Sequence, residues 1–220
     1  MERVVIGNAE LWHGDCREVL PHVSADACVA DPPYGIGYVH SGGGIGVGDR
    51  RNHGVPIHGD DQPFDPEQLL RFPTVLMFGA DHFRSRLPDG GTFIAWDKSC
   101  GIGPADSFAD AEFAWTNLKL KRNVIRFLWK GVACEKAGED GGRRWHPTTK
   151  PQGVMGWCLQ QMPQARTILD PYMGSGSTGC AALALGRRFV GIEIDRRYFD
   201  VACERIDAAS RQTALFEAAA

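Results

Sequence analysis

Short apolar runs alternate with longer amphipathic segments along most of this 220-residue chain. Runs rich in Val, Ile, Phe and Ala predict strands, and apolar residues spaced three or four apart predict helices. Strands are predicted over residues 10–13, 27–30, 74–78, 92–95, 113–120, 124–130, 167–169 and 189–193, and helices over residues 81–87, 104–111, 151–162, 177–185 and 197–210. This alternation indicates a single α/β domain (residues 1–220) with a mostly parallel sheet and helices on both faces.

Two stretches interrupt the pattern. Residues 35–59 contain nine glycines and almost no periodicity, which predicts a mobile loop. Residues 119–150 carry nine basic and three acidic residues, a local net charge of +6. A turn at Lys121-Arg122-Asn123 predicts that this basic segment begins as an antiparallel hairpin.

Composition excludes several classes of protein. Hydrophobic residues make up 43% of the chain and charged residues 23%, an ordinary globular balance. The sequence has neither an apolar run of about 18 residues nor an apolar leader, so we expect a soluble, cytoplasmic protein. The closest two of the seven cysteines are twelve residues apart, so neither a metal site nor a disulfide framework is predicted.

An acid, two prolines and a tyrosine follow the apolar segment 27–30. Asp31 would then lie at the carboxyl end of a strand, where open α/β sheets bind ligands. Pro32 and Pro33 stiffen the turn and leave carbonyl groups able to accept hydrogen bonds. A carboxylate, the Pro32 carbonyl and the Tyr34 ring suit a planar ligand that carries an amino group. In isolation, such a tetrapeptide is as often a surface turn.

A glycine-rich turn lies between a predicted strand and a predicted helix. Gly174, Gly176 and Gly179 fit the spacing GxGxxG, and glycine lets the backbone approach a ligand closely. Glu193 ends the strand that follows, and in nucleotide-binding α/β folds a carboxylate at this place in the motif binds ribose hydroxyls. The turn lacks the Gly-Lys-Ser/Thr ending of a phosphate loop, which leaves a dinucleotide or a related cofactor.

The order of these motifs determines how the sheet must be completed. Only the last part of the chain follows Gly174, enough for one helix, one strand and a second helix. The missing strands must come from the N-terminal part of the chain. The fold is therefore predicted to be a circularly permuted Rossmann-like sheet, in which Asp31 lies near the glycine turn despite their separation in sequence.

Together the motifs resemble the amino-group DNA methyltransferases that use S-adenosylmethionine, in the permuted arrangement called the β class. The matching segments are Asp31-Pro32-Pro33-Tyr34 (catalytic motif), Asp170-Pro171-Tyr172-Met173-Gly174-Ser175-Gly176-Ser177-Thr178 (cofactor turn, with Tyr172 where Phe is usual), His146-Pro147-Thr148-Thr149-Lys150-Pro151, Leu11-Trp12-His13-Gly14-Asp15 and Gly191-Ile192-Glu193-Ile194-Asp195. The resemblance covers nearly the whole chain. The resemblance is weakest over residues 38–58 and 134–144. Within this family, the chain is most similar in type to stand-alone enzymes of phage or prophage origin.

The resemblance implies methyl transfer from S-adenosylmethionine to the exocyclic amino group of a flipped-out DNA base. The implied catalytic residues are Asp31, Pro32, Pro33 and Tyr34. The implied cofactor-binding residues are Asp15, Lys150, Asp170, Tyr172, Gly174, Ser175, Gly176, Ser177, Thr178 and Glu193. The chain is acidic overall, with a net charge of −3, so DNA binding is assigned to the basic segment, through Arg122, Arg126, Lys130, Arg143 and Arg144.

Two alternatives to this function stay open. In the family that the chain resembles, Asp at the first motif position is more typical of adenine enzymes. N6 of adenine is therefore the predicted target, and N4 of cytosine is the alternative. A nicotinamide-dependent oxidoreductase built on the glycine turn is a second alternative, from another class. The expected partner is duplex DNA, and no association with a membrane is expected. A homodimer is one option for assembly.

Overall fold

In the computed structural model, which describes residues 1–38, 57–101, 109–130, 133–134 and 149–218, one nine-stranded sheet has the order β1-β2-β11-β10-β3-β4-β6-β5-β7. Its strands are β1 (Glu2–Ile6), β2 (Ala9–His13), β3 (Ala27–Ala30), β4 (Thr74–Phe78), β5 (Thr92–Asp97), β6 (Ala111–Thr116), β7 (Val124–Arg126), β10 (Thr167–Asp170) and β11 (Arg188–Glu193). A separate ribbon pairs β8 (Trp129–Lys130) with β9 (Ala133–Cys134).

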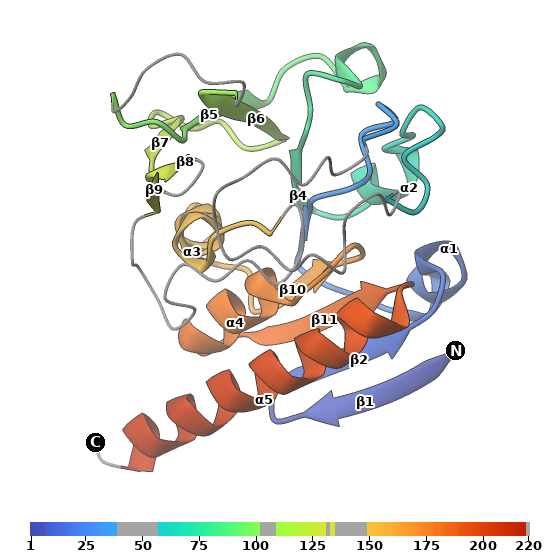
Figure 1. Cartoon of the computed structure of the whole chain (residues 1–220), viewed down its shortest axis with the longest axis vertical. Helices are drawn as coiled ribbons and strands as arrows, with labels where there is room; N and C mark the ends of the chain where they lie inside the picture. The colour runs from blue at the N-terminus through green and yellow to red at the C-terminus, as the bar shows by residue number, and fades with distance from the viewer. Residues whose placement is uncertain (39–56, 102–108, 131–132, 135–148, 219–220) are drawn as a thin grey trace.

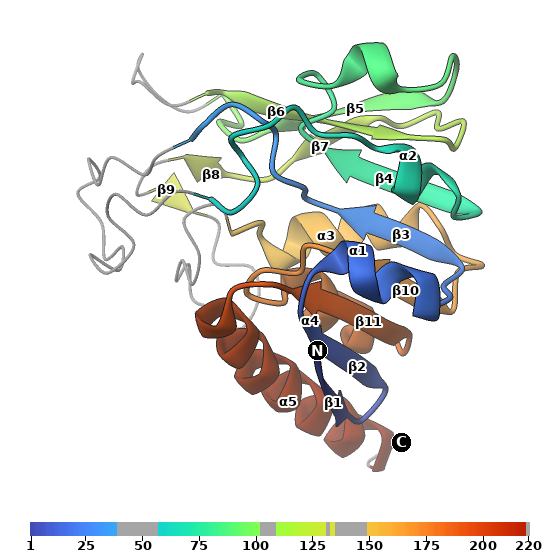
Figure 2. The ribbon, with the colours of Figure 1, turned by 90° about the vertical axis from the view of Figure 1, so that its right-hand side faces the viewer.

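Helices cover both faces of the sheet, as predicted (Figures 1 and 2). One face carries α3 (Gln152–Gln160), α4 (Ser177–Ala184) and α5 (Arg196–Ala218), whose apolar residues join one core cluster. The opposite face carries α1 (Cys16–Val19) and α2 (Glu67–Leu70), which belong to a second cluster. Strands β3, β4 and β10 are buried on both sides between these clusters, which explains their continuous apolar sequences.

The pairing of β10 confirms the permuted arrangement. β2 and β3 follow one another closely along the chain, yet β11 and β10 lie between them in the sheet. β10 pairs in parallel with β3, with Ile168 opposite Ala27 and Leu169 opposite Cys28. The carboxyl ends of β2, β11, β10, β3, β4 and β5 therefore meet at one edge of the sheet, and the first residues of the antiparallel β6 lie at the same edge.

The predicted hairpin around residues 121–123 is wrong. β6 pairs antiparallel with β4 on one side and β5 on the other, so both of its edges are already occupied. β7 instead crosses over and pairs in parallel with β5, with Ile125 opposite Trp96. The antiparallel pairs in this half of the sheet are therefore β4 with β6 and β5 with β6.

The predicted helix at residues 81–87 is also wrong, because the chain there forms turns and a short 3-10 helix, Arg84–Arg86. A seven-residue segment followed by a proline and two glycines is too short to form a stable α-helix by itself. Most of the helix predicted at residues 104–111 lies outside the described residues, and Ala111 begins β6. Most of the predicted loop at residues 35–59 also lies outside them.

Among the helices in the described ranges, none combines the length and apolar character needed to cross a bilayer. Within the same ranges, His, Cys, Asp and Glu side chains form no cluster that could hold a metal ion.

Candidate active site

The two sequence motifs meet at the carboxyl edge of the sheet. Asp31 immediately follows β3, and Asp170 ends the neighbouring β10. Because these strands are parallel and adjacent, the Asp-Pro-Pro-Tyr turn and the glycine turn start side by side. The sheet thus brings together two segments that lie near opposite ends of the sequence.

Asp31 is held by two donors. The Tyr34 hydroxyl donates to its Oδ1 at 2.7 Å, and the Lys150 ammonium donates to its Oδ2 at 2.7 Å. The side chain of Asp31 is 18% exposed, which leaves it within reach of a ligand. Burial raises the pKa of Asp31, while the positive charge of Lys150 opposes this rise.

The Tyr34 ring packs closely against neighbouring residues. It stacks on His82 with ring centroids 5.2 Å apart and an interplanar angle of 18°. At Gly79, which has a φ of +68°, an added Cβ would lie 2.1 Å from the ring, so this position requires glycine. The Lys150 ammonium also lies 5.8 Å from the ring centroid, so a planar ligand can use only the part of the Tyr34 ring that these residues leave open.

Lys150 lies against the catalytic motif. Besides Asp31, its ammonium lies 3.2 Å from Glu112 Oε2 and 3.3 Å from the Tyr34 hydroxyl oxygen. Lys150, which the sequence predicts as a cofactor-binding residue, thus directly contacts the predicted catalytic carboxylate. The two carboxylates more than offset the effect of burial, so the pKa of Lys150 is raised and the side chain is charged.

Asp170 holds the glycine turn in place by two hydrogen bonds. Its Oδ1 accepts the Tyr172 amide hydrogen at 3.0 Å, and its Oδ2 accepts the Thr178 hydroxyl hydrogen at 2.5 Å. Ser175 and Ser177 on the same turn accept hydrogen bonds from Arg205 of α5. Asp170, Thr178, Ser175 and Ser177 are all buried, so their side chains shape the turn from inside.

Gly174 and Gly176 serve different purposes. A Cβ at Gly174 would meet no atom within 4 Å, so this residue faces open space. A Cβ at Gly176 would lie 3.2 Å from Ala202 and Ile206, because this glycine allows α5 to pack closely. The sequence pattern makes the two glycines equivalent, but Gly174 is the one at which a ligand could approach the backbone.

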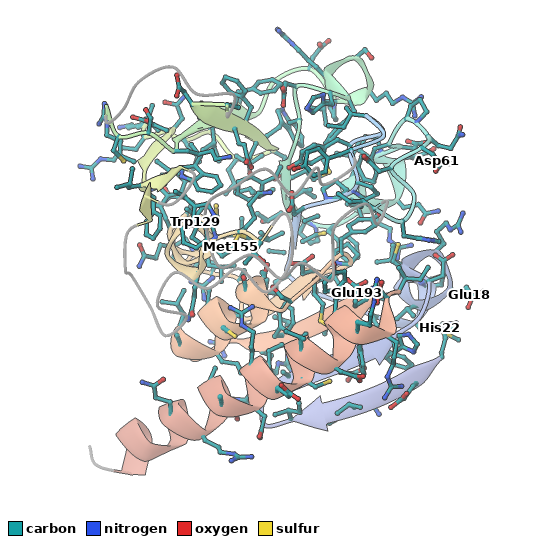
Figure 3. The ribbon with its side chains drawn as sticks, viewed as in Figure 1. Glu18, His22, Asp61, Trp129, Met155 and Glu193 are labelled. Carbon is teal, nitrogen blue, oxygen red and sulfur yellow. The ribbon has the colours of Figure 1, made fainter. Side chains whose placement is uncertain are left out.

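Glu193 lies beside that open space, at the end of β11 (Figure 3). Its Oε2 accepts the Gly174 amide hydrogen at 2.9 Å, and its Oε1 accepts that of Asp195 at 2.7 Å. Burial raises the pKa of Glu193 to about 7. The carboxylate is therefore held in place next to the turn, where its remaining lone pairs could accept hydrogen bonds from ribose hydroxyls.

The other predicted cofactor residues have structural contacts of their own. Asp15 is the N-cap of α1, accepts the Arg17 amide hydrogen at 2.9 Å and forms an ion pair with the Arg17 side chain. The Tyr172 ring packs edge-on against Phe64, with centroids 5.9 Å apart. Both lie at the carboxyl edge of the sheet, so neither contact removes them from the site.

The predicted DNA-binding residues are spread more widely than expected. Arg126 ends β7 and is exposed at the edge of the sheet that carries Asp31. Arg122 is also exposed but precedes β7, at the other end of that strand. Lys130 is in β8, and Arg143 and Arg144 lie outside the described residues.

Sequence reasoning missed two acids. Glu112 is the second residue of β6, one residue before the predicted strand, and forms an ion pair with Lys150. Asp60 is buried and accepts the amide hydrogens of Gly35 at 2.8 Å and Tyr38 at 2.6 Å, which fixes the chain just after the catalytic motif. Neither belongs to a sequence motif described above, and their importance arises from contacts that only the fold creates.

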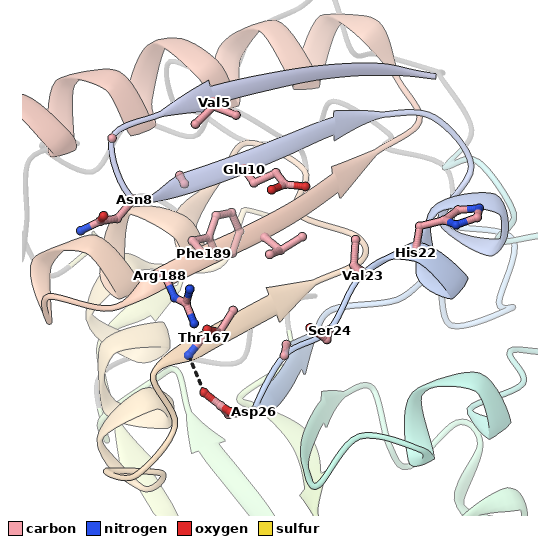
Figure 4. A pocket seen from close by; sticks show the side chains of 14 residues that line it. Val5, Asn8, Glu10, His22, Val23, Ser24, Asp26, Thr167, Arg188 and Phe189 are labelled. Atoms are coloured by element: carbon pink, nitrogen blue, oxygen red, sulfur yellow. Dashed lines mark hydrogen bonds between the residues drawn. The ribbon is translucent and has the colours of Figure 1, made fainter.

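A cleft of about 500 Å³ lies away from this site, at the amino ends of β10 and β11 (Figure 4). Its lining includes Asn8, Glu10, Asp26, Thr167 and Arg188. Asp26 accepts the Thr167 amide hydrogen there at 2.8 Å. This cleft is at the opposite edge of the sheet from Asp31 and Gly174, so it is not the site that the two motifs form.

Solved structures share this fold. The M1.HpyAVI–SAM complex superposes with a TM-score of 0.54 at 22% identity, covering 90% of this chain and 99% of that one. The cytosine-N4-specific PvuII DNA methyltransferase superposes with a TM-score of 0.55 at 11% identity, covering 95% and 93%. The chain therefore has the Rossmann-like methyltransferase fold.

Sequence similarity is more specific. A profile of the N6/N4 DNA methylases matches residues 114–204. The type II methyltransferase M.HinfI of Haemophilus influenzae is 34% identical over 250 aligned residues, covering 88% of this chain and 67% of that protein. The chain belongs to the amino-group DNA methyltransferase family, whose cofactor is S-adenosylmethionine. This assignment favours methyl transfer over the nicotinamide alternative.

Replacing Asp170 by asparagine is expected to stabilise the protein at alkaline pH. Burial raises the pKa of Asp170 to about 7 from an ordinary value of 3.8. Ionisation is therefore less favourable in the folded state, so the group's contribution to stability falls as the pH rises from about 4 to 7. The new asparagine keeps an acceptor for the Tyr172 amide and a partner for Thr178 without the charge.

Urea unfolding at several pH values measures this effect. Because one unit of pKa corresponds to about 1.4 kcal/mol, we expect Asp170→Asn to gain on the order of 1 kcal/mol or more at pH 8. The gain should shrink towards zero as the pH falls to about 4. Asp170→Ala, which loses both hydrogen bonds, is the control and should be less stable than the parent at every pH. A pH-independent difference for Asp170→Asn would contradict this account of Asp170.

Proposed function

We propose that this protein methylates N6 of adenine in DNA at the site formed by Asp31 and the glycine turn. The observation that carries the proposal is the parallel pairing of β3 with β10, because the Asp-Pro-Pro-Tyr turn and the glycine turn then start side by side at one edge of the sheet. The acid at the first position of the catalytic motif favours adenine over cytosine, since serine is more typical of cytosine enzymes in this family. Methylation of N4 of cytosine is the second candidate.

The residues at the turn suit S-adenosylmethionine. Open space at Gly174 lets a ligand approach the backbone, and Glu193 offers acceptors for ribose hydroxyls beside it. Glu193 also favours a cationic ligand when it is ionised. When bound, the cofactor supplies an electrophilic methyl group on a sulfonium.

The chain's own residues prepare the target nitrogen. The lone pair of an exocyclic amine is delocalised into the base ring, so the amine is a weak nucleophile. Asp31 and the Pro32 carbonyl accept its two hydrogens, which favours a tetrahedral nitrogen with a localised lone pair. A stacked base could not reach this buried edge, so the target base is flipped out of the duplex at a cost of a few kcal/mol.

Incubation with DNA and labelled S-adenosylmethionine, followed by chromatography of the nucleosides, tests the proposal. We expect label in N6-methyl-2′-deoxyadenosine. Label in N4-methyl-2′-deoxycytidine instead would support the second candidate, and label in neither nucleoside would refute the proposed function. Heat-denatured DNA as a parallel substrate reports the cost of flipping, because an unpaired base is already free to enter the site.

Arg126 is expected to contribute to DNA binding more than Arg122. Both are exposed, but only Arg126 lies at the edge of the sheet that carries Asp31. Replacing a phosphate-contacting arginine by glutamine weakens binding nearly uniformly across sequences and lowers the salt slope by roughly one.

Titrations of a labelled duplex at several salt concentrations compare Arg126→Gln with Arg122→Gln as its matched control. Arg126→Gln should raise the dissociation constant and flatten the salt dependence, with cofactor affinity unchanged. If the two variants bind DNA equally well, or if Arg122→Gln is the weaker, DNA does not approach over the end of β7.

A further inference from the structure

Four charged side chains of alternating sign extend from the sheet to the catalytic motif. Lys98 Nζ lies 2.7 Å from Glu112 Oε1, Glu112 Oε2 lies 3.2 Å from Lys150 Nζ, and Lys150 Nζ lies 2.7 Å from Asp31 Oδ2. These residues come from the end of β5, the start of β6, the segment before α3 and the turn after β3. This row of four charged side chains forms because the antiparallel β6 begins at the edge where its neighbours end.

We infer that Glu112, supported by Lys98, is a positioning residue for methyl transfer: it shares the Lys150 ammonium with Asp31 and thereby sets the orientation and charge of that carboxylate. This inference rests on the proposed function of Asp31 as the acceptor for the target amine. Glu112 itself contacts Lys98 and Lys150, so it acts through Lys150 and not on the base.

The surroundings of Lys150 explain why a second carboxylate is needed. The Lys150 side chain is only 7% exposed, and its ammonium also lies over the Phe78 ring, 5.2 Å from the centroid. A buried ammonium with Asp31 as its sole anionic partner would bind that carboxylate tightly and compete with the amine of the base. Glu112 shares the ammonium, which leaves Asp31 free to exchange one of its partners for the substrate.

Electrostatics support the same arrangement. Burial would raise the pKa of Glu112, but Lys150 and Lys98 lower it to about 2, so Glu112 stays ionised at neutral pH. In the described residues, the charged or titratable groups that act on Asp31 include Tyr34, Lys150, Glu112 and, from β10, Asp170. With Lys98, Glu112, Lys150 and Asp31 all ionised, the row of four is neutral overall.

The pH dependence of single-turnover methylation tests the inference, because the reaction requires ionised Asp31. Lys150→Met removes a positive charge next to Asp31, so the pKa of Asp31 should rise. The acid limb of the pH–rate profile, where the rate falls as Asp31 is protonated, should therefore move to higher pH. Glu112→Gln removes a negative neighbour, so the acid limb should move to lower pH, and the plateau rate should fall about tenfold or more as Lys150 binds Asp31 more tightly. A neighbouring charge at this range shifts an ionisation by about one pH unit or more.

Lys98→Met provides a milder variant that touches neither Lys150 nor Asp31 directly. It removes the charge that offsets Glu112, so the acid limb should move up by less than in Lys150→Met. Damage to the fold alone would lower the rate of all three variants without shifts of opposite sign. An unchanged profile in Glu112→Gln, or a shift in the same direction as Lys150→Met, would overturn the inference.

A second measurement separates this inference from the proposed function. The carbon-13 signal of the Asp31 carboxyl group can be titrated by NMR in the whole chain without DNA or cofactor. The same opposite shifts in Glu112→Gln and Lys150→Met would support the coupling even if the parent methylates neither adenine nor cytosine. If methylation occurs but the Asp31 titration is identical in all variants, the coupling fails and the proposed function stands.

Discussion

Replacing Asp31 by alanine is expected to abolish methyl transfer and to leave cofactor affinity nearly unchanged. Asp31 follows β3 and has its carboxylate tied to Tyr34 and Lys150, whereas the open backbone and Glu193 lie at the ends of β10 and β11. Loss of a group that acts on the reacting nitrogen costs about 10²–10⁴ in rate. Calorimetry with S-adenosylmethionine and single-turnover methylation measure the two effects separately.

Asp31→Asn is the companion variant, because alanine also removes the acceptor oxygens that bind Tyr34 and Lys150. The asparagine oxygen can still accept from Tyr34 or Lys150, so this variant should fold as the parent does. It accepts the amine's hydrogens more weakly than a carboxylate, so it should still lose activity. Exposed Asp61 provides an Asp→Ala control with full activity. Loss of cofactor binding in step with activity would contradict the separate roles.

Replacing Gly174 by asparagine is expected to weaken cofactor binding at least about tenfold, equivalent to about 1.4 kcal/mol. Gly174 has a φ of +50°, a conformation that asparagine tolerates better than other non-glycine residues, so backbone strain is small. A side chain at this position would enter the open space beside Glu193, where the backbone is otherwise accessible. Folding should therefore survive while the ligand is excluded.

Gly186→Asn is a matched control for this variant. Gly186 has a φ of +66°, also faces open space, and follows α4 at the far end from the turn. It should bind cofactor like the parent. Gly176→Ala tests the other glycine: its side chain would press on Ala202 and Ile206, so the loss should appear in the free energy of unfolding. Parental affinity in Gly174→Asn would show that the cofactor does not approach this part of the turn.

The chemistry-bearing motifs were predictable because each is local. Asp31 follows an apolar strand directly, and Gly174 lies between a strand and a helix, so the sequence order alone places both at one edge of a permuted sheet. The charged row from Lys98 to Asp31 was not predictable. Glu112 and Lys150 are distant in sequence and come from unrelated elements, and nothing in their neighbours marks either as buried.

Strand pairing shows the same limit. Two apolar segments separated by Lys121-Arg122-Asn123 favour a hairpin, because short connections usually join neighbouring antiparallel strands. β5 already occupies that edge of β6, so β7 had to pair elsewhere. β1 was missed because it is an edge strand with exposed positions at Glu2, Arg3 and Val5, which weakens the apolar signal. Competition among strands for an edge is a property of the whole sheet.

The insertion of β10 and β11 between β2 and β3 has a consequence for the synthesis of the protein. A ribosome that has just translated the segment before α3 has released β2 and β3 without the two strands that join them. The edge of β2 that will pair with β11 and the edge of β3 that will pair with β10 stay unpaired until residues 167–193 emerge. Unpaired strand edges favour association with other chains. The centre of the sheet is thus assembled after its flanks, so pauses in translation before Thr167 should increase aggregation of the nascent chain.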